Sequence, residues 1–155
     1  MTLEALLSYA HILAILTAVV FISSETALCR IEWMNERVVE RLVTVDRIYR
    51  VGLVLVLLTG LARITWGMKG ALWYWGNGLL HLKLALFLVV AALAIRPAMR
   101  FRRWRRQLHE TGALPDEVQI RQARRQGMVA AHLIAVIPLA AVFLARGYGA
   151  FRNAA

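Results

Sequence analysis

Residues 79–87 read Leu79-Leu80-His81-Leu82-Lys83-Leu84-Ala85-Leu86-Phe87, an apolar run interrupted only by two ionisable side chains. Ionisable groups at membrane depth are costly unless they face a protein interior, a cofactor or water, so His81 and Lys83 are candidates for a functional site. Two more histidines, His11 and His132, lie in other apolar runs. Three histidines within the apolar runs of so small a protein predict that it holds a ligand.

The composition indicates a membrane protein. Of the 155 residues 60% are hydrophobic, whereas soluble domains are close to half apolar. The length suits one integral membrane domain, residues 1–155. The net charge of +10 does not indicate nucleic-acid binding, because the basic residues flank apolar runs and no nucleic-acid motif accompanies them. A single cysteine, Cys29, excludes an internal disulfide and a thiolate metal cluster.

Four apolar runs approach or exceed the length of about 20 residues that a membrane span requires. We expect spans at about residues 4–28, 47–66, 77–96 and 126–146. This pattern predicts an all-α fold, a transmembrane four-helix bundle in contact with the lipid bilayer. The second run is the weakest, because it reaches membrane length only if Arg50 and Arg63 extend to the two interfaces.

The arginines predict the orientation of the spans. Five arginines lie between Arg30 and Arg50, and nine lie between Arg96 and Arg125. Because basic loops stay on the cytoplasmic side, we expect cytoplasmic loops at residues 30–46 and 97–125 and both termini outside. In a bacterium this arrangement gives a multi-pass protein of the inner membrane with periplasmic termini.

The second basic segment is too long for a simple turn. We expect Arg100–Leu108 to continue the third helix beyond the bilayer, and Gly112 to end it. Leu114-Pro115-Asp116-Glu117 predicts a helix start, with proline in the first turn and acidic residues at the positive end of the helix dipole.

Helical spacing places several residues of the first span on one stripe, which we interpret as the bundle-facing side. On this stripe His11 lies in the outer half and Glu25 near the inner surface. Because His132 approaches from the inner side, we expect Glu25 and His132 to form an inner polar pair. The alternative for Glu25 is an interfacial salt bridge with Arg30 or Arg50. The stripe consists of Ser8, His11, Ala18, Ile22, Glu25 and Cys29.

His81 and Lys83 are about 200° apart around a helix, so they cannot share a face, and the sequence leaves open which one faces the bundle. Spans two and four end in the same tripeptide, Leu61-Ala62-Arg63 and Leu144-Ala145-Arg146. If the two hairpins are related by an axis along the membrane normal, His11 and His81 face each other, with Arg63 and Arg146 above them.

Two neutral histidines on facing helices can bind a haem iron from its two faces, within the apolar walls of a bundle. Arg63 and Arg146 could then pair with the haem propionates. The alternatives are that His11 and His81 form helix-to-helix hydrogen bonds, or that Glu25, His132 and His11 belong to a proton or ion path. A metal site made of His11, His81 and Glu25 is not expected, because its ligands would lie near opposite membrane surfaces.

The same residues resemble a known family. Asn77-Gly78-Leu79-Leu80-His81-Leu82-Lys83-Leu84 resembles the Gly-Trp-Leu-His-x-Lys-Leu opening of the third span in HemJ-type protoporphyrinogen oxidases, small bacterial membrane proteins that bind haem b. Tyr9-Ala10-His11-Ile12 is similar to their first-span Lys-Ala-Leu-His-Ile segment. The whole chain looks still more like an uncharacterised bacterial family of four-span membrane proteins.

The resemblance implies that His11 and His81 hold haem b and that Lys83 belongs to an active site. The chain departs from the oxidases before span four, where Arg125-Gln126-Gly127-Met128 replaces their Asn-Glu-x-Pro element. The resemblance therefore implies a shared fold and haem b more than the oxidation of protoporphyrinogen.

Two hypotheses follow for the function. The first is an inner-membrane protein that binds haem b through His11 and His81 for electron transfer or a tetrapyrrole-related redox step, with a redox partner or another membrane protein. The second is a cofactor-free small membrane protein with a transport or assembly role. The sequence leaves open whether the chain is an enzyme, its substrate and its oligomeric state.

Overall fold

The structure is a computed structural model that describes residues 2–66, 71–146 and 148. Its four long helices are α1 (Thr2–Leu28), α2 (Glu36–Thr65), α4 (Gly78–Thr111) and α5 (Glu117–Ala145). A short 3₁₀ helix, η1 (Ile31–Trp33), and a short helix, α3 (Ala71–Trp75), lie in two of the connections. Each long helix is apolar and long enough to cross a membrane, so the predicted all-α bundle with four membrane spans is confirmed.

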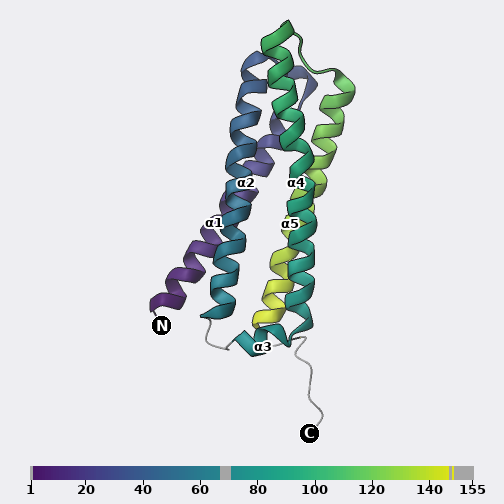
Figure 1. The fold of residues 1–155 in the computed structure, drawn as a ribbon. Coiled ribbons are helices and arrows are strands. Elements are labelled where there is room, and N and C mark those ends of the chain that lie inside the picture. The colour runs from purple at the N-terminus through teal and green to yellow at the C-terminus, as the bar shows by residue number, and fades with distance from the viewer. Residues whose placement is uncertain (1, 67–70, 147, 149–155) are drawn as a thin grey trace.

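The four long helices form a ring of neighbours in which α1 packs against α2 and α5, and α4 packs against the same two helices. Figure 1 shows the chain running up and down through the bundle. The start of α1, the end of α5 and helix α3 lie at one end of the bundle, which we call the end with the termini, and the two arginine-rich connections lie at the other. We call the second end the basic end.

The predicted cytoplasmic loop at residues 30–46 is mostly helical, because α2 already begins at Glu36. The side chain of Asn35 caps this helix by accepting a hydrogen bond from the backbone N–H of Val38 at 3.0 Å. Val39, Leu42 and Val43 then bury one face of the first turns. Hydropathy had located only the part of α2 that is uniformly apolar, and the helix extends well beyond it.

The second arginine-rich segment is also helical apart from a short turn. The helix α4 continues to Thr111, and Gly112 ends it with a left-handed φ of 70°, as the sequence predicted. Asp116 caps α5 by accepting a hydrogen bond from the N–H of Gln119 at 2.8 Å. Pro115 therefore precedes the helix instead of occupying its first turn. The predicted loop at 97–125 shrinks to the residues between α4 and α5.

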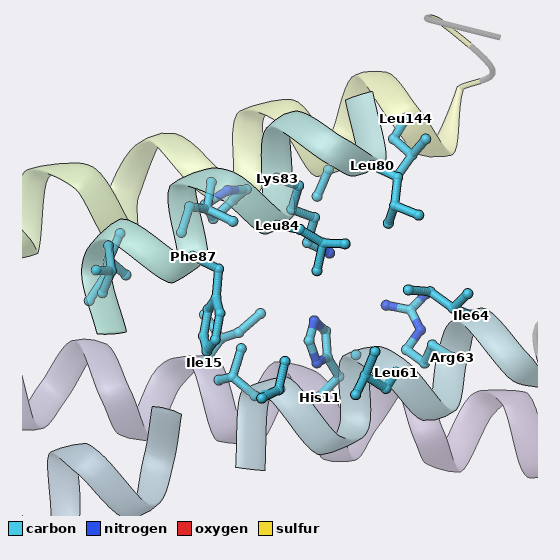
Figure 2. A pocket seen from close by; sticks show the side chains of 18 of the residues that line it. His11, Ile15, Leu61, Arg63, Ile64, Leu80, Lys83, Leu84, Phe87 and Leu144 are labelled. Carbon is cyan, nitrogen blue, oxygen red and sulfur yellow. The ribbon is translucent and has the colours of Figure 1, made fainter. Parts of the chain in front are cut away.

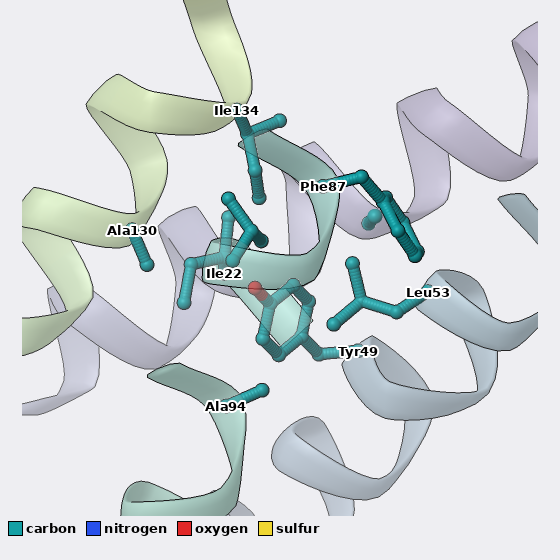
Figure 3. Close-up of a cluster of buried hydrophobic side chains, with 9 residues drawn as sticks. Ile22, Tyr49, Leu53, Phe87, Ala94, Ala130 and Ile134 are labelled. Carbon is teal, nitrogen blue, oxygen red and sulfur yellow. The ribbon is translucent and has the colours of Figure 1, made fainter. Parts of the chain in front are cut away.

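Two groups of buried apolar side chains hold the bundle together. The middle cluster, drawn in Figure 3, joins all four long helices. The basic-end cluster contains Trp104, which is only 2% exposed and donates its indole N–H to Gln119 Oε1 at 2.7 Å. Trp104 therefore packs inside the protein. The basic-end cluster comprises Cys29, Val39, Leu42, Val43, Phe101, Trp104, Ile120 and Ala123.

Small residues allow α1 to approach its two neighbours closely. A Cβ atom on Gly127 of α5 would lie 2.4 Å from Thr26 Oγ1, and one on Gly52 of α2 would lie 3.4 Å from the backbone nitrogen of Ala18. Such close approach is the usual way that helices associate in membranes, where the lipid offers no hydrophobic driving force.

Candidate functional site

A cavity of about 360 Å³ lies among the four long helices, towards the end that holds the termini. Its volume lies in the range of small-molecule binding sites. Most of its lining is aliphatic, with Phe87 of α4 on one side (Figure 2). The nitrogen-bearing side chains that line it are His11 of α1, Arg63 of α2 and Lys83 of α4. Tyr74 of α3 also contributes to the wall.

His11 is 4% exposed and is oriented by Thr59 of α2. Its Nδ1 lies 2.8 Å from Thr59 Oγ1, and this hydroxyl donates its single hydrogen to the carbonyl of Leu55 at 2.6 Å. Because the hydroxyl has no second hydrogen to give, Nδ1 of His11 must be the donor. The neutral ring then carries a lone pair on Nε2, and Figure 2 shows the ring directed into the cavity.

Gly60 of α2 leaves the space that the His11 ring occupies. A Cβ atom at this position would lie 3.3 Å from His11 Cε1, closer than ordinary packing allows. Thr59 and Gly60 thus fix both the tautomer and the position of the imidazole. Of the three intramembrane histidines, His11 is the one that lines the cavity, as the first-span stripe predicted.

Lys83 and Arg63 bring two positive charges to the same cavity. Both side chains are half-buried, and in Figure 2 they approach the cavity from opposite sides. Neither forms an ion pair with any carboxylate in the part of the chain that the structure describes. Charges in apolar surroundings are costly without a counter-charge, so this cavity favours a ligand that carries acidic groups.

The structure does not bring His81 and His11 together. His81 is exposed and lies outside the cavity lining. Its Nδ1 donates to the backbone carbonyl of Asn77 at 3.1 Å, and its ring lies beside that of Trp75. The facing pair of histidines expected from the sequence is therefore absent. Lys83, on the other face of α4, points to the bundle.

The predicted pairing of Arg63 with Arg146 fails for a similar reason. Arg146 is exposed at the C-terminal cap of α5 and does not line the cavity. The α1–α2 and α4–α5 hairpins therefore differ at this point, because Arg63 lines the cavity and Arg146 does not. Lys83 supplies the second cation instead.

The inner polar pair of Glu25 and His132 is also absent. His132 is exposed, and its Nδ1 donates to the carbonyl of Met128 one turn earlier, at 2.7 Å. Glu25 is 2% exposed, and its Oε2 has no hydrogen-bond partner within the described residues. The alternative salt bridge to Arg30 or Arg50 is not formed there either.

Sequence reasoning missed the residues that do lie near Glu25. Asp46 and Tyr49 of α2 are each 1% exposed, and the charge of Asp46 acts on Glu25. Asp46 forms an ion pair with Arg50 at 2.9 Å, and the burial of its carboxyl group was not foreseen. The sequence did contain a signal for the burial of these two residues, because Asp46 and Tyr49 continue the helical spacing of the buried residues Leu42 and Val43.

Comparison with known proteins agrees with this architecture. The sequence model of a family described as "Predicted membrane protein (DUF2214)" matches residues 3–149. No curated protein and no solved structure matches the chain, so no relative supports the resemblance to HemJ-type oxidases, which stays a prediction. Because the match extends over nearly all of the four-helix bundle, the chain belongs to the DUF2214 family of predicted membrane proteins.

Proposed function

We propose that this integral membrane protein binds haem b in the cavity, where Nε2 of His11 would hold the iron. The proposal rests on one arrangement: an imidazole nitrogen directed into an apolar cavity that also contains two cations, none of which has a partner or counter-charge among the described residues. Nε2 of a neutral histidine is a good ligand for haem iron. The aliphatic walls suit the porphyrin, and Lys83 and Arg63 suit the two propionates.

Each alternative to haem leaves His11 or the two cations of the cavity without a role. A fatty acid or an anionic lipid would use the walls, Lys83 and Arg63, but it would not use the lone pair of His11. A cofactor-free protein would hold two uncompensated charges in apolar surroundings, at a cost in free energy. Haem b uses the lone pair, the walls and both cations together.

The residues of this chain would hold and orient the haem. Thr59 keeps the hydrogen of His11 on Nδ1, and a partner of this kind commonly raises the affinity of a metal ligand. Bound haem would supply one-electron transfer, so the role that we propose is electron transfer or a tetrapyrrole-related redox step. The haem would then exchange electrons with a redox partner at the cavity end of the bundle.

The absorption spectrum tests the proposal directly. Protein expressed with ample haem supply and purified in detergent should show a Soret band in a ratio of one haem to one chain. The His11→Ala variant should lose this band. His81→Ala is the matched control and should keep it, because His81 lies outside the cavity. A colourless wild-type protein, or a band that survives in His11→Ala, would overturn the proposal.

We also propose that the basic end faces the cytoplasm of a bacterial cell and that both termini are periplasmic. Support comes from the arginines in the two connections at that end. Alkaline phosphatase, which is active only in the periplasm, should be active when fused after Ala155 and inactive when fused within the turn at Ala113. The reverse pattern would contradict this orientation.

A further inference from the structure

A second polar site lies in the bundle, apart from the cavity. It consists of Glu25 on α1 and of Asp46 and Tyr49 on α2, which are 2%, 1% and 1% exposed. One oxygen of each side chain is buried without a hydrogen-bond partner in the described structure: Glu25 Oε2, Asp46 Oδ1 and Tyr49 Oη. The antiparallel register that brings Gly52 against Ala18 and Thr59 against His11 places Glu25 opposite Asp46, with Tyr49 one helical turn further along α2.

Tyr49 links this site to the packing of the bundle. Its ring belongs to the middle cluster, and in Figure 3 its hydroxyl points from α2 towards Ile22. Ile22 lies one helical turn before Glu25 on the same stripe of α1. The hydroxyl is therefore a buried, unpartnered polar group directed at the part of α1 that carries Glu25.

Counting donors and acceptors shows what the site lacks. Arg50 donates to Asp46 Oδ2 through Nε at 2.9 Å and through Nη2 at 2.9 Å. If both carboxyl groups are ionised, Glu25 Oε2 and Asp46 Oδ1 are two buried acceptors without a donor, because Tyr49 Oη donates to neither of them in the described structure. A proton on Glu25 supplies a donor, and it also removes a charge from a fully buried position.

We propose that Glu25, Asp46 and Tyr49 form a proton-binding site in which the carboxyl group of Glu25 holds a proton at neutral pH. Asp46 stays ionised beside Arg50, and its Oδ1, which accepts no hydrogen bond in the described structure, leaves a buried acceptor for the proton that Glu25 carries. The proposal does not depend on haem, because it concerns a different set of residues.

The surrounding charges favour a proton over a metal cation. On α2, Arg50 acts on Glu25; on α4, Arg102 acts on Asp46. Cys29 follows Glu25 by one turn of α1, and the positive charges of Arg100 of α4 and Arg124 of α5 act on its thiol. The positive charge of these arginines would repel a sodium ion. A proton neutralises Glu25 and, unlike a metal cation, does not need several oxygen ligands around it.

Infrared spectroscopy of the full chain in detergent or lipid tests the site. At neutral pH, wild-type protein should show the C=O stretching band of a protonated carboxyl group, and this band should shift on transfer to D₂O. Glu25→Gln should abolish the band. Glu32→Gln is the matched control, since Glu32 is exposed, and it should leave the band unchanged.

The thermal stability of Glu25→Gln provides a second measurement. Glutamine has the shape of a protonated glutamic acid, so the melting temperature should stay close to that of the wild type. A missing band, a band that persists in Glu25→Gln, or a large loss of stability in that variant would overturn the proposal. A band that appears only when sodium is replaced by a large organic cation would assign a sodium site instead and would equally overturn it.

Discussion

The two ends of the bundle are built in different ways. At the basic end, bulky side chains interlock around Trp104, and Val39 and Leu42 have no exposed surface. At the end with the termini, the buried apolar cluster contains only Ile64, Leu80 and Leu144, and it borders a cavity of about 360 Å³.

This contrast indicates a division of roles along one bundle. The basic end fastens the α1–α2 pair to the α4–α5 pair, so the other end can keep a cavity without relying on contacts inside it. A site held by a rigid scaffold binds its ligand with less loss of conformational freedom. We therefore expect substitutions at the basic end to change stability, and substitutions at the cavity to change ligand binding.

Removing the largest side chain of the basic end should have the greatest effect. Trp104→Ala should lower the free energy of unfolding by about 3–5 kcal/mol, because it leaves a void and unpairs Gln119. Phe87→Ala should cost less, because Phe87 already borders the cavity and therefore has fewer packing contacts to lose. Denaturation in detergent, followed by circular dichroism, gives both values. Equal losses would contradict the division of roles.

Closing the gap between α1 and α5 should have the next largest effect. Gly127→Ala places a Cβ atom 2.4 Å from Thr26 Oγ1, so it should destabilise the protein by about 1–3 kcal/mol despite the better helix propensity of alanine. The same change in a Thr26→Ala background should cost less, as a double-mutant cycle would show. Gly78→Ala is the control, because nothing lies within 4 Å of its added Cβ.

Removing one cavity cation should weaken haem binding without unfolding the bundle. Lys83→Met keeps the length of the side chain but loses a charged hydrogen bond worth about 1.5–3 kcal/mol, so haem affinity should fall about 10- to 100-fold. Arg146→Met should leave the affinity unchanged, because Arg146 lies outside the cavity. Haem titration of the apoprotein measures both, and similar losses in the two variants would refute the assignment of Lys83.

The smallest expected effect comes from the residue behind His11. Thr59→Val removes the acceptor of the His11 Nδ1 hydrogen, so the ring can rotate and haem affinity should fall about tenfold. Thr59→Ser retains the hydroxyl and should bind haem as the wild type does. Unchanged affinity in Thr59→Val would show that the hydrogen bond does not orient the ligand.

Much of the fold follows from patterns within single helices. The length of the apolar runs locates the four spans. The spacing of His11, Ala18, Ile22 and Glu25 identifies the stripe of α1 that faces the bundle, and all four residues are buried. Gly112 ends α4 because a left-handed residue stops a helix there. These features depend on local geometry, which the sequence expresses directly.

The site depends on how each helix is rotated, which the sequence specifies only weakly. His81 and Lys83 are equally unusual in an apolar run, and only packing against α2 and α5 selects Lys83. The buried residues Leu80 and Phe87 carry a usable signal, because Lys83 and not His81 falls on the stripe between them. The burial of Asp46 and Tyr49 could be inferred from helical spacing, but their position near Glu25 could not, since it requires the register between α1 and α2.

The length of α4 has a consequence for how the protein denatures. Its 34 residues extend about 51 Å at about 1.5 Å per residue, well beyond the roughly 30 Å of hydrocarbon in a bilayer. The stalk that emerges on the arginine-rich side is surrounded by water and is held together as soluble proteins are, by the exclusion of apolar surface from solvent. Urea should therefore loosen that stalk first, while the lipid-embedded helices stay intact.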